Sequence, residues 1–306
     1  MKVLITGGAG YVGTELTKTL VKCDDVDDIL IYDNLGRQNY NLFLGRRLER
    51  HEKVNFISGD ILDSRKLRMM LEGVDVVIHL AARVTTPFAN TDAHFHEQVN
   101  HWGTAEVVNA VEESGVQKFI YASSTSVYGS SKDFLTEDTI PNAKTFYGIS
   151  KLRGEEHVRR LFKKKQTYVL RCGNVYGYSK SMRFDAVINK FMFEANFNNR
   201  ISIHGNGKQS RSFISVGLLA EVMEKLIINE VPGGNYNLVD KNYSILDIVD
   251  ALKTLYPLLE FIFVNQHLSL RDLKVSPESK LRNYLNYIND KDLKTELLEF
   301  KRRFSF

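Results

Sequence analysis

The chain has 306 residues, of which 43% are hydrophobic and 25% are charged, and its formal net charge is +4. These values are typical of a soluble globular protein with one large or two modest domains, and they argue against disorder and against binding to nucleic acid. The two cysteines have no disulfide-framework or metal-ligand spacing, and no apolar run is long enough for a signal peptide or a membrane span. We therefore expect a cytoplasmic protein with no nucleic-acid or membrane partner.

Short apolar runs alternate with amphipathic stretches in the first half of the chain. The pattern predicts helices at 11–21, 64–71, 104–113 and 146–162, between strands at 3–6, 29–32, 54–58, 76–81, 118–122 and 168–171. This alternation predicts an α/β fold with a doubly wound, parallel sheet of the Rossmann type.

The pattern is less regular after residue 172. Segment 173–177 is typical of a loop, helices are expected near 185–197 and 216–229, and a strand is expected at 235–239. We therefore expect a Rossmann-type domain over residues 1–172 and a second, smaller α+β substrate domain over 173–306. The second is expected to interleave with the first around 205–240.

A glycine-rich motif follows the first expected strand directly. Residues 6–13 read TGGAGYVG and fit the pattern G-x-G-x-x-G at the start of a helix. Glycines allow a tight turn and a close approach of the backbone, and free amides at the helix N-terminus bind a pyrophosphate. Tight turns of other kinds also need glycine, so the motif alone is a weak signal. It predicts cofactor contacts from Gly7, Gly10, Tyr11, Val12 and Gly13.

An acidic residue, Asp33, ends the second expected strand 20 residues after Gly13. A carboxylate at this position accepts hydrogen bonds from ribose hydroxyls and repels a 2′-phosphate, which favours NAD over NADP. Arg37 is close enough in sequence to hold a 2′-phosphate, so NADP stays open, and a turn or cap is the alternative role for Asp33. Ligands of such sheets bind at the carboxyl ends of the strands, so we expect further cofactor contacts from Asn34, Asp60, Ile61, Leu80, Ala81 and Ala82.

Tyr147 and Lys151 are four residues apart and should share one face of a helix. A neighbouring ammonium group lowers the pKa of a phenol, which makes tyrosine a usable base near neutral pH. Ser124 follows the fifth expected strand and can hold a substrate hydroxyl between itself and Tyr147. Helix spacing and serine-rich caps also occur without any activity, but the three groups together predict a catalytic site of Ser124, Tyr147 and Lys151. Lys151 can also bind the nicotinamide ribose.

These motifs resemble one family over nearly the whole chain, the extended short-chain dehydrogenase/reductases that act on nucleotide sugars. The resemblance implies bound NAD and a homodimer formed through the helices near 104–113 and 146–162. Val99-Asn-His-Trp-Gly-Thr104 matches a family motif whose asparagine, Asn100, lies at the cofactor site. The segments Leu170 to Gly177 and Arg211 to Val216 imply that Asn174 and Arg211 bind the sugar diphosphate. A second family arginine corresponds to Arg271, in a segment, 267–280, that aligns only with a gap.

The residues after Ser124 separate the reactions of this family. Dehydratases carry Asp-Glu there as the acid and base of an elimination, whereas this chain has Thr125-Ser126. The pattern therefore looks like that of a 4-epimerase, in which NAD takes a hydride from C4, the 4-keto sugar turns over, and the hydride returns to its other face. A 4,6-dehydratase, a 4-keto reductase and an NAD-bound regulatory protein of the same fold are the alternatives. No metal site is expected, because His94, His96 and His101 lack further ligand spacing.

Overall fold

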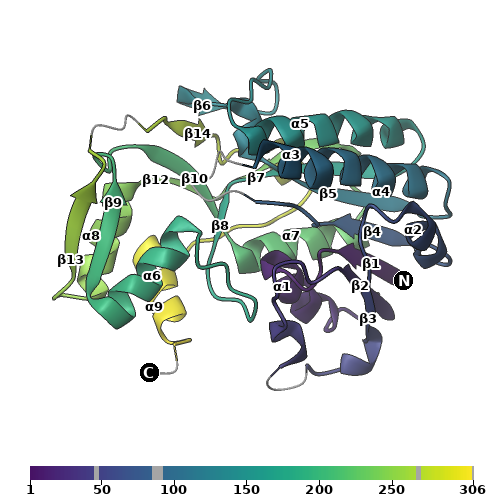
Figure 1. Ribbon diagram of the computed structural model, residues 1–306, viewed down its shortest axis with the longest axis horizontal. Coiled ribbons are helices and arrows are strands. Elements are labelled where there is room, and N and C mark those ends of the chain that lie inside the picture. Colours follow the sequence, from purple (N-terminus) through teal and green to yellow (C-terminus); the bar gives the residue numbers. More distant parts are fainter. Residues whose placement is uncertain (45–47, 85–91, 267–269, 305–306) are drawn as a thin grey trace.

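The computed structural model describes residues 1–44, 48–84, 92–266 and 270–304 (Figure 1). A seven-stranded sheet forms its centre, in the order β11-β7-β5-β4-β1-β2-β3, and every pairing between neighbours is parallel. This confirms the expected doubly wound sheet. Its strands are β1 (Lys2–Thr6), β2 (Asp28–Asp33), β3 (Val54–Ser58), β4 (Val76–His79), β5 (Lys118–Ser124), β7 (Gln166–Cys172) and β11 (Gly234–Leu238).

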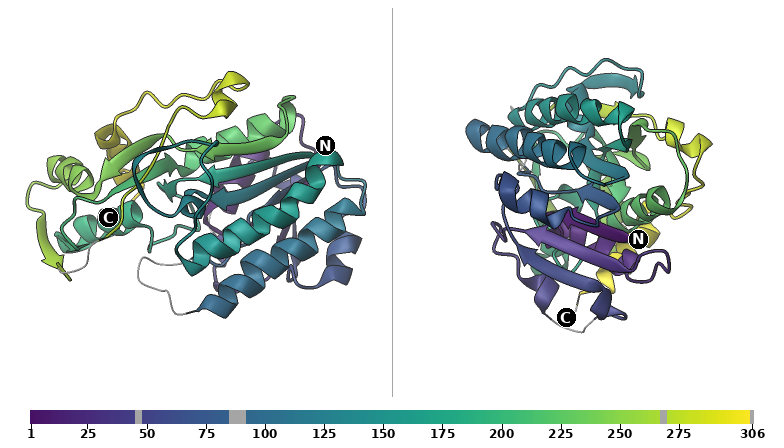
Figure 2. Two further views of the ribbon diagram at one scale, coloured as in Figure 1. Left: turned by 90° about the horizontal axis from the view of Figure 1, so that it is seen from above. Right: turned by 90° about the vertical axis from the view of Figure 1, so that its right-hand side faces the viewer.

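Helices cover both faces of this sheet (Figures 1 and 2). Strand β1 shows why, because Val3 and Ile5 point into one buried cluster while Leu4 points into the other. Strands buried on both faces need continuous apolar sequence, which is the pattern of this half of the chain. One face carries α1 (Tyr11–Leu20) and α7 (Val216–Ile228), and the other carries α2 (Ser64–Met70), α4 (Gly103–Glu112) and α5 (Phe146–Val158).

The helical segment that contains α4 begins well before the expected residue 104. It starts with α3 (Ala93–His96) and continues through a π-helical turn, η3 (Glu97–Trp102). These turns carry His, Glu and Gln instead of a periodic apolar stripe, so the sequence pattern did not reveal them. The remaining short helices are η1 (Asn41–Phe43), η2 (His51–Lys53), η4 (Thr125–Tyr128), η5 (Arg159–Lys163) and η6 (Lys280–Asn283).

The second region has a hydrophobic core of its own, which includes Tyr176, Phe213 and Leu297. Its sheet has the order β12-β10-β8, and β8 lies where a loop was expected, because three residues are too few for a readable strand pattern. The elements are β8 (Asn174–Tyr176), α6 (Val187–Asn198), β9 (Arg200–His204), β10 (Ser210–Ser215), β12 (Lys241–Ser244), α8 (Ile245–Leu255), β13 (Glu260–Val264) and α9 (Leu293–Lys301).

The chain crosses between the two regions more than once. After β10 it returns through α7 and β11 to the large sheet, and β6 (Ser131–Leu135) pairs with β14 (Leu273–Val275) near the other end of the chain. The carboxyl ends of β5 and β7 therefore open directly onto β8 and β10. No helix within the described ranges is both long enough and apolar enough to cross a bilayer.

Candidate active site

The glycine-rich turn between β1 and α1 packs too closely for any side chain. Gly7 has a positive φ of 71°, and a Cβ there would lie 2.6 Å from the backbone nitrogen of Ala81. A Cβ on Gly13 would lie 2.5 Å from Gly8. Gly10 is the N-cap of α1. The first turn of this helix includes the amides of Tyr11 and Val12 and contains no acidic residue. Since first-turn amides have no acceptor within the helix, the turn can receive an anion.

Asp33 lies at the end of β2, beside this turn. Its Oδ2 accepts a hydrogen bond from the amide of Ala9 at 3.1 Å, and its Oδ1 accepts one from the amide of Leu35 at 2.8 Å. Burial raises the pKa of this carboxyl. A carboxylate can accept about four hydrogen bonds, so room is left for a ribose. Arg37 points elsewhere, since its Nη2 donates to the carbonyl oxygen of Val84 at 3.4 Å.

The other expected cofactor residues line the same edge of the sheet. Asn34 Nδ2 donates to Asp60 Oδ2 at 2.8 Å, which joins the ends of β2 and β3. Ile61 is buried beside them, and Leu80, Ala81 and Ala82 follow β4 directly. The edge thus combines the polar residues Asn34 and Asp60 with apolar ones, of which Ala81 and Ala82 are small.

His79, the last residue of β4, lies at this edge and had no predicted role. Its Nδ1 lies 2.6 Å from Thr6 Oγ1 and its Nε2 lies 3.0 Å from Thr104 Oγ1. Complete burial lowers its pKa to about 3, so the ring is neutral and links β1 to α4. A histidine inside an apolar strand carries no sequence signal for such a link.

Helix α5 presents Lys151 to the end of β5. Lys151 is only 2% exposed, its Nζ donates to the carbonyl oxygen of Ala122 at 2.8 Å, and it lies 4.7 Å from the centre of the Tyr121 ring. Burial lowers the pKa of Lys151 to about 8. The Lys151 ammonium is therefore held in place, and it loses its proton more readily than an exposed lysine does.

The structure places Tyr147 beside Ser124, one helical turn before Lys151 on α5. Ser124 ends β5, is 9% exposed, and donates to Ser126 Oγ at 3.1 Å. Burial raises the pKa of the Tyr147 phenol, whereas the charge of Arg183 and a hydrogen bond with Ser124 lower it. A phenol beside a hydroxyl and an ammonium can exchange a proton with a bound alcohol.

Asn100 lies in the π-helical turn and is completely buried. Its Oδ1 accepts from the amide of Arg83 at 2.7 Å, and its Nδ2 donates to the Arg83 carbonyl at 2.9 Å and to Ser150 Oγ at 3.0 Å. Ser150 in turn donates to the carbonyl oxygen of Tyr147 at 2.9 Å. Asn100 thus ties the loop after β4 to α5, and its contact with a cofactor stays a prediction.

The expected substrate residues meet beyond the end of β7. Asn174 begins β8, and its Nδ2 donates to the Ser212 carbonyl at 3.1 Å. Arg211 Nη1 donates to the Ser210 carbonyl at 2.9 Å and to the carbonyl oxygen of Arg271. Burial lowers the Arg211 pKa, and the charge of Asp272 opposes this shift without cancelling it.

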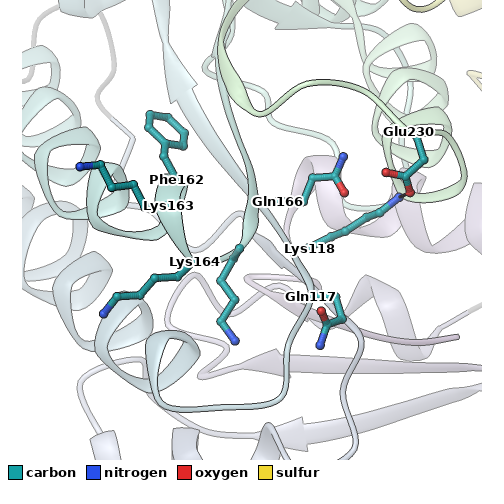
Figure 3. A pocket seen from close by; sticks show the side chains of 8 residues that line it. Gln117, Lys118, Phe162, Lys163, Lys164, Gln166 and Glu230 are labelled. Carbon is teal, nitrogen blue, oxygen red and sulfur yellow. Dashed lines mark ion pairs between the residues drawn. The ribbon is translucent and has the colours of Figure 1, made fainter.

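A separate depression of about 500 Å³ lies at the opposite, amino-terminal end of β5 and β7 (Figure 3). Its lysines are largely satisfied, because Lys118 pairs with Glu230 at 3.3 Å and Lys165 donates to the Ser114 carbonyl at 2.7 Å. It contains none of the expected site residues. Over the part of the chain that the structure describes, no group of three or more His, Cys, Asp or Glu side chains is placed to hold a metal ion.

Comparison with known proteins agrees with this geometry. Residues 3–238 match the NAD dependent epimerase/dehydratase family. The chain is 31% identical over 298 residues to a mouse dTDP-D-glucose 4,6-dehydratase, which covers 95% of this chain and 78% of the relative. It is 33% identical over 269 residues to an uncharacterized UDP-glucose epimerase of Bacillus subtilis, with 83% of each chain covered.

A solved structure extends the similarity to the whole fold. The UDP-glucuronic acid 4-epimerase of Bacillus cereus, in complex with UDP-glucuronic acid and NAD, superposes with a TM-score of 0.86 at 25% identity. The match covers 99% of this chain and 98% of that one. On the family match and these relatives, the chain belongs to the NAD-dependent epimerase/dehydratase family of enzymes.

Proposed function

We propose that this protein is an NAD-dependent nucleotide-sugar 4-epimerase. The single observation that carries the choice of reaction is the turn after β5, where Ser124, Thr125 and Ser126 offer only hydroxyl groups. An elimination of water needs a carboxylic acid and a base at this place, because alcohols neither gain nor lose protons near neutral pH. Inversion of the configuration at C4 needs only the tyrosine, the serine and the cofactor.

The residues of the edge fit NAD. The turn packs so closely at Gly7 and Gly13 that a Cβ at either would clash with backbone, and the free amides at the N-terminus of α1 would bind a pyrophosphate there. Asp33 keeps free acceptor capacity for the adenosine ribose, while Arg37 turns away toward the loop after β4. When bound, NAD supplies a hydride acceptor and donor for C4 of the sugar.

The chain's own side chains move the proton. Tyr147, as phenolate, takes the proton of the C4 hydroxyl, and Ser124 holds that oxygen in a hydrogen bond. Lys151 supplies the positive charge that stabilises the phenolate. Tyr147 returns the same proton to the alkoxide at the end of the cycle, so the enzyme finishes in its starting state.

Recognition of the nucleotide is assigned to the second region within residues 173–306, and cofactor binding to the sheet domain of residues 1–172, to which α7 and β11 also contribute. Asn174, Arg211 and Arg271 together offer an amide and two guanidinium groups to a diphosphate, which is the geometry that arginine recognises well. Held only by its diphosphate, the sugar keeps the freedom to present either face to the cofactor.

The dehydratase names of some relatives make that reaction the second candidate. After burial, the strongest influences on the pKa of Tyr147 are Arg183, Ser124, Cys172 and Arg37, and none of these four is a carboxyl. Glu155 is the acid that acts on Lys151, but it is completely buried and bound by Arg171. The site therefore favours epimerisation over elimination.

The enzyme is expected to act as a homodimer in the cytoplasm. Trp102 is 58% exposed and stacks on His101 with ring centres 4.5 Å apart, and His101 stacks on His157 of α5 at 5.1 Å. An exposed aromatic cluster that joins η3 and α5 suits a helix-to-helix interface. Both cysteines are free and buried, which suits a reducing compartment.

A panel of UDP-, dTDP- and GDP-sugars followed by NMR tests the proposal. We expect one nucleotide hexose or its uronate to reach equilibrium with its C4 epimer, and denatured protein to release NAD. Conversion of no sugar in the panel, or release of NADP instead of NAD, would contradict the assignment.

A further inference from the structure

A buried ion pair lies behind the proposed catalytic side chains and takes no part in the proton transfer. Glu155 is 0% exposed and Arg171 is 2% exposed. Their contact is bidentate, with Arg171 Nε to Glu155 Oε1 at 3.0 Å and Nη2 to Oε2 at 2.7 Å. Burying two charges costs about as much as their attraction returns, so stability alone gives little reason for the pair.

Glu155 belongs to the same helix face as the catalytic residues. Tyr147, Lys151 and Glu155 follow one another at intervals of four along α5. Ser123 donates its hydroxyl to Glu155 Oε1 at 2.6 Å, and Ser123 lies opposite Arg171 in the β5–β7 pairing. Two adjacent strands thus bind the Glu155 carboxylate of α5, β5 through Ser123 and β7 through Arg171. Ser123 is the residue directly before Ser124.

The same guanidinium also holds the turn that follows Ser124. Arg171 Nη1 donates to the hydroxyl of Tyr128 at 2.9 Å, and Tyr128 donates to Asn237 Oδ1 at 2.8 Å. Tyr128 is the last residue of η4, which carries Thr125 and Ser126. Arg171 therefore connects the catalytic helix to the turn at the sugar side of the site.

Close packing along α5 means that even a small displacement of the helix would disturb the groups that it touches. A Cβ on Gly148 would lie 2.5 Å from the Ser126 carbonyl oxygen, and one on Gly154 would lie 2.4 Å from the Tyr121 hydroxyl. Backbone and rings touch along the helix, and the ion pair adds a directional polar contact. Such a contact fixes the rotation and the position of a helix along its axis, which apolar packing fixes less sharply.

We propose that Glu155 and Arg171 are the positioning pair of this active site. They hold α5 against β5 so that Tyr147 and Lys151 face Ser124, and the Glu155 carboxylate supplies the negative charge that keeps the buried Lys151 protonated. The inference rests on the proposed function of Tyr147 and Lys151.

The surroundings of Lys151 support the second role. Burial lowers the pKa of Lys151, and Cys172 and Glu155 act to raise it. Burial also raises the pKa of the Cys172 thiol to about 12, so the thiol is neutral near pH 7, and the carboxylate that acts on Lys151 is Glu155, in its ion pair with Arg171. The titratable groups that face or adjoin Lys151 from α5, β4, β5 and β7 are Tyr147, Glu155, His79, Tyr121 and Cys172.

The sign of the effect follows from the charge. Without the Glu155 carboxylate, the pKa of Lys151 falls further, so the ammonium is lost at a lower pH. Because the cation stabilises the Tyr147 phenolate, the alkaline limb of the pH–activity profile should move to lower pH.

The test compares Glu155→Gln, the double variant Glu155→Gln with Arg171→Met, and Glu156→Gln as control, since Glu156 is the exposed neighbour on α5. Glu155→Gln alone leaves a buried guanidinium without a counter-charge and can fail to fold, whereas the double variant removes both charges. We expect the folded double variant to lose about 10²-fold in kcat, as misplaced catalytic groups do, with KM nearly unchanged. The control should match the wild type.

A second readout follows Lys151 without substrate. Protein labelled with ¹³C at lysine Cε is titrated by NMR, and the Lys151 signal is assigned by its absence in Lys151→Met. The pKa of Lys151 should fall in the double variant and stay unchanged in Glu156→Gln. If the wild type converts no nucleotide sugar but this pKa still falls, the proposed function fails and the charge role stands.

Three outcomes would overturn the proposal. A folded double variant with wild-type kcat and a wild-type Lys151 titration would make the pair dispensable. A double variant that does not fold would make the pair a stability element. A loss of kcat with an unchanged Lys151 titration would overturn the charge role.

Discussion

The two sides of the active site are built differently. On the sheet side, Lys151 and Ser124 are 2% and 9% exposed, and their polar atoms contact protein atoms at 2.8 and 3.1 Å. On the side of the second region, Asn174 and Arg271 are exposed, and the Asn174 and Arg211 side chains donate hydrogen bonds to backbone carbonyl oxygens.

This difference separates chemistry from recognition. Groups that move a proton gain from a fixed position and a dry environment, which the sheet side supplies before any substrate arrives. Guanidinium groups that contact only carbonyl oxygens can exchange these neutral acceptors for a phosphate, whose full charge binds more strongly. Variants on the two sides should therefore act on different kinetic constants.

The largest effect should come from Tyr147→Phe, which removes the hydroxyl and keeps the ring. We expect kcat to fall by about 10² to 10⁴-fold, the range of one acid/base group, while the thermal midpoint changes little. Steady-state kinetics together with a melting curve make the measurement. Activity close to that of the wild type would show that the base lies elsewhere.

Arg211→Met tests the recognition side. A hydrogen bond to a charged group contributes about 1.5–3 kcal/mol, so KM for the nucleotide sugar should rise about 10 to 10²-fold with a smaller change in kcat. Arg200→Met is the matched control, because Arg200 lies on β9 in an exposed ion pair with Glu260 at 2.7 Å. A loss of kcat without a rise in KM would place Arg211 in the chemistry instead.

Asp33→Ala should weaken the hold on the cofactor without touching either side of the sugar site. We expect more NAD to be lost during gel filtration, since two ribose hydrogen bonds disappear along with the contacts to the Ala9 and Leu35 amides. Absorbance of cofactor released on denaturation measures the retained fraction. Unchanged retention would mean that Asp33 serves only the turn.

Trp102→Glu should have the smallest effect on chemistry. A carboxylate inserted into an apolar helix interface favours the separated subunits, so light scattering should show a shift from dimer to monomer at micromolar concentration. The control is Phe134→Glu, which changes another exposed aromatic residue, on β6. A wild type that is already monomeric would contradict the proposed assembly.

The sequence predicted the sheet well because both-face burial leaves a strong apolar pattern, as in β1 with Val3, Leu4 and Ile5. It missed β8, whose three residues depend on pairing with β10, and it missed the turns before α4. The assignment of catalytic, cofactor and substrate residues stays a prediction, although the structure brings Ser124, Tyr147 and Lys151 together.

Contacts between residues that are distant in the chain could not be predicted from the sequence pattern. His79 and Arg171 lie inside strands, where a buried polar residue looks like an exception to the apolar pattern. Their partners, Thr104 for one and Glu155 for the other, come from helices that pack on the sheet only in the folded chain. No local spacing encodes such a pair.

The most direct test of the proposed reaction is turnover of the converted nucleotide sugar in D₂O, followed by NMR. Epimerisation never breaks the C5–H bond, so we expect the C4 epimer to form without deuterium at C5 and with no net change in NADH absorbance. Elimination of water must remove the C5 proton. Deuterium at C5, or a stable 4-keto-6-deoxy product, would show that the protein is a dehydratase whose acid and base lie outside the turn after β5.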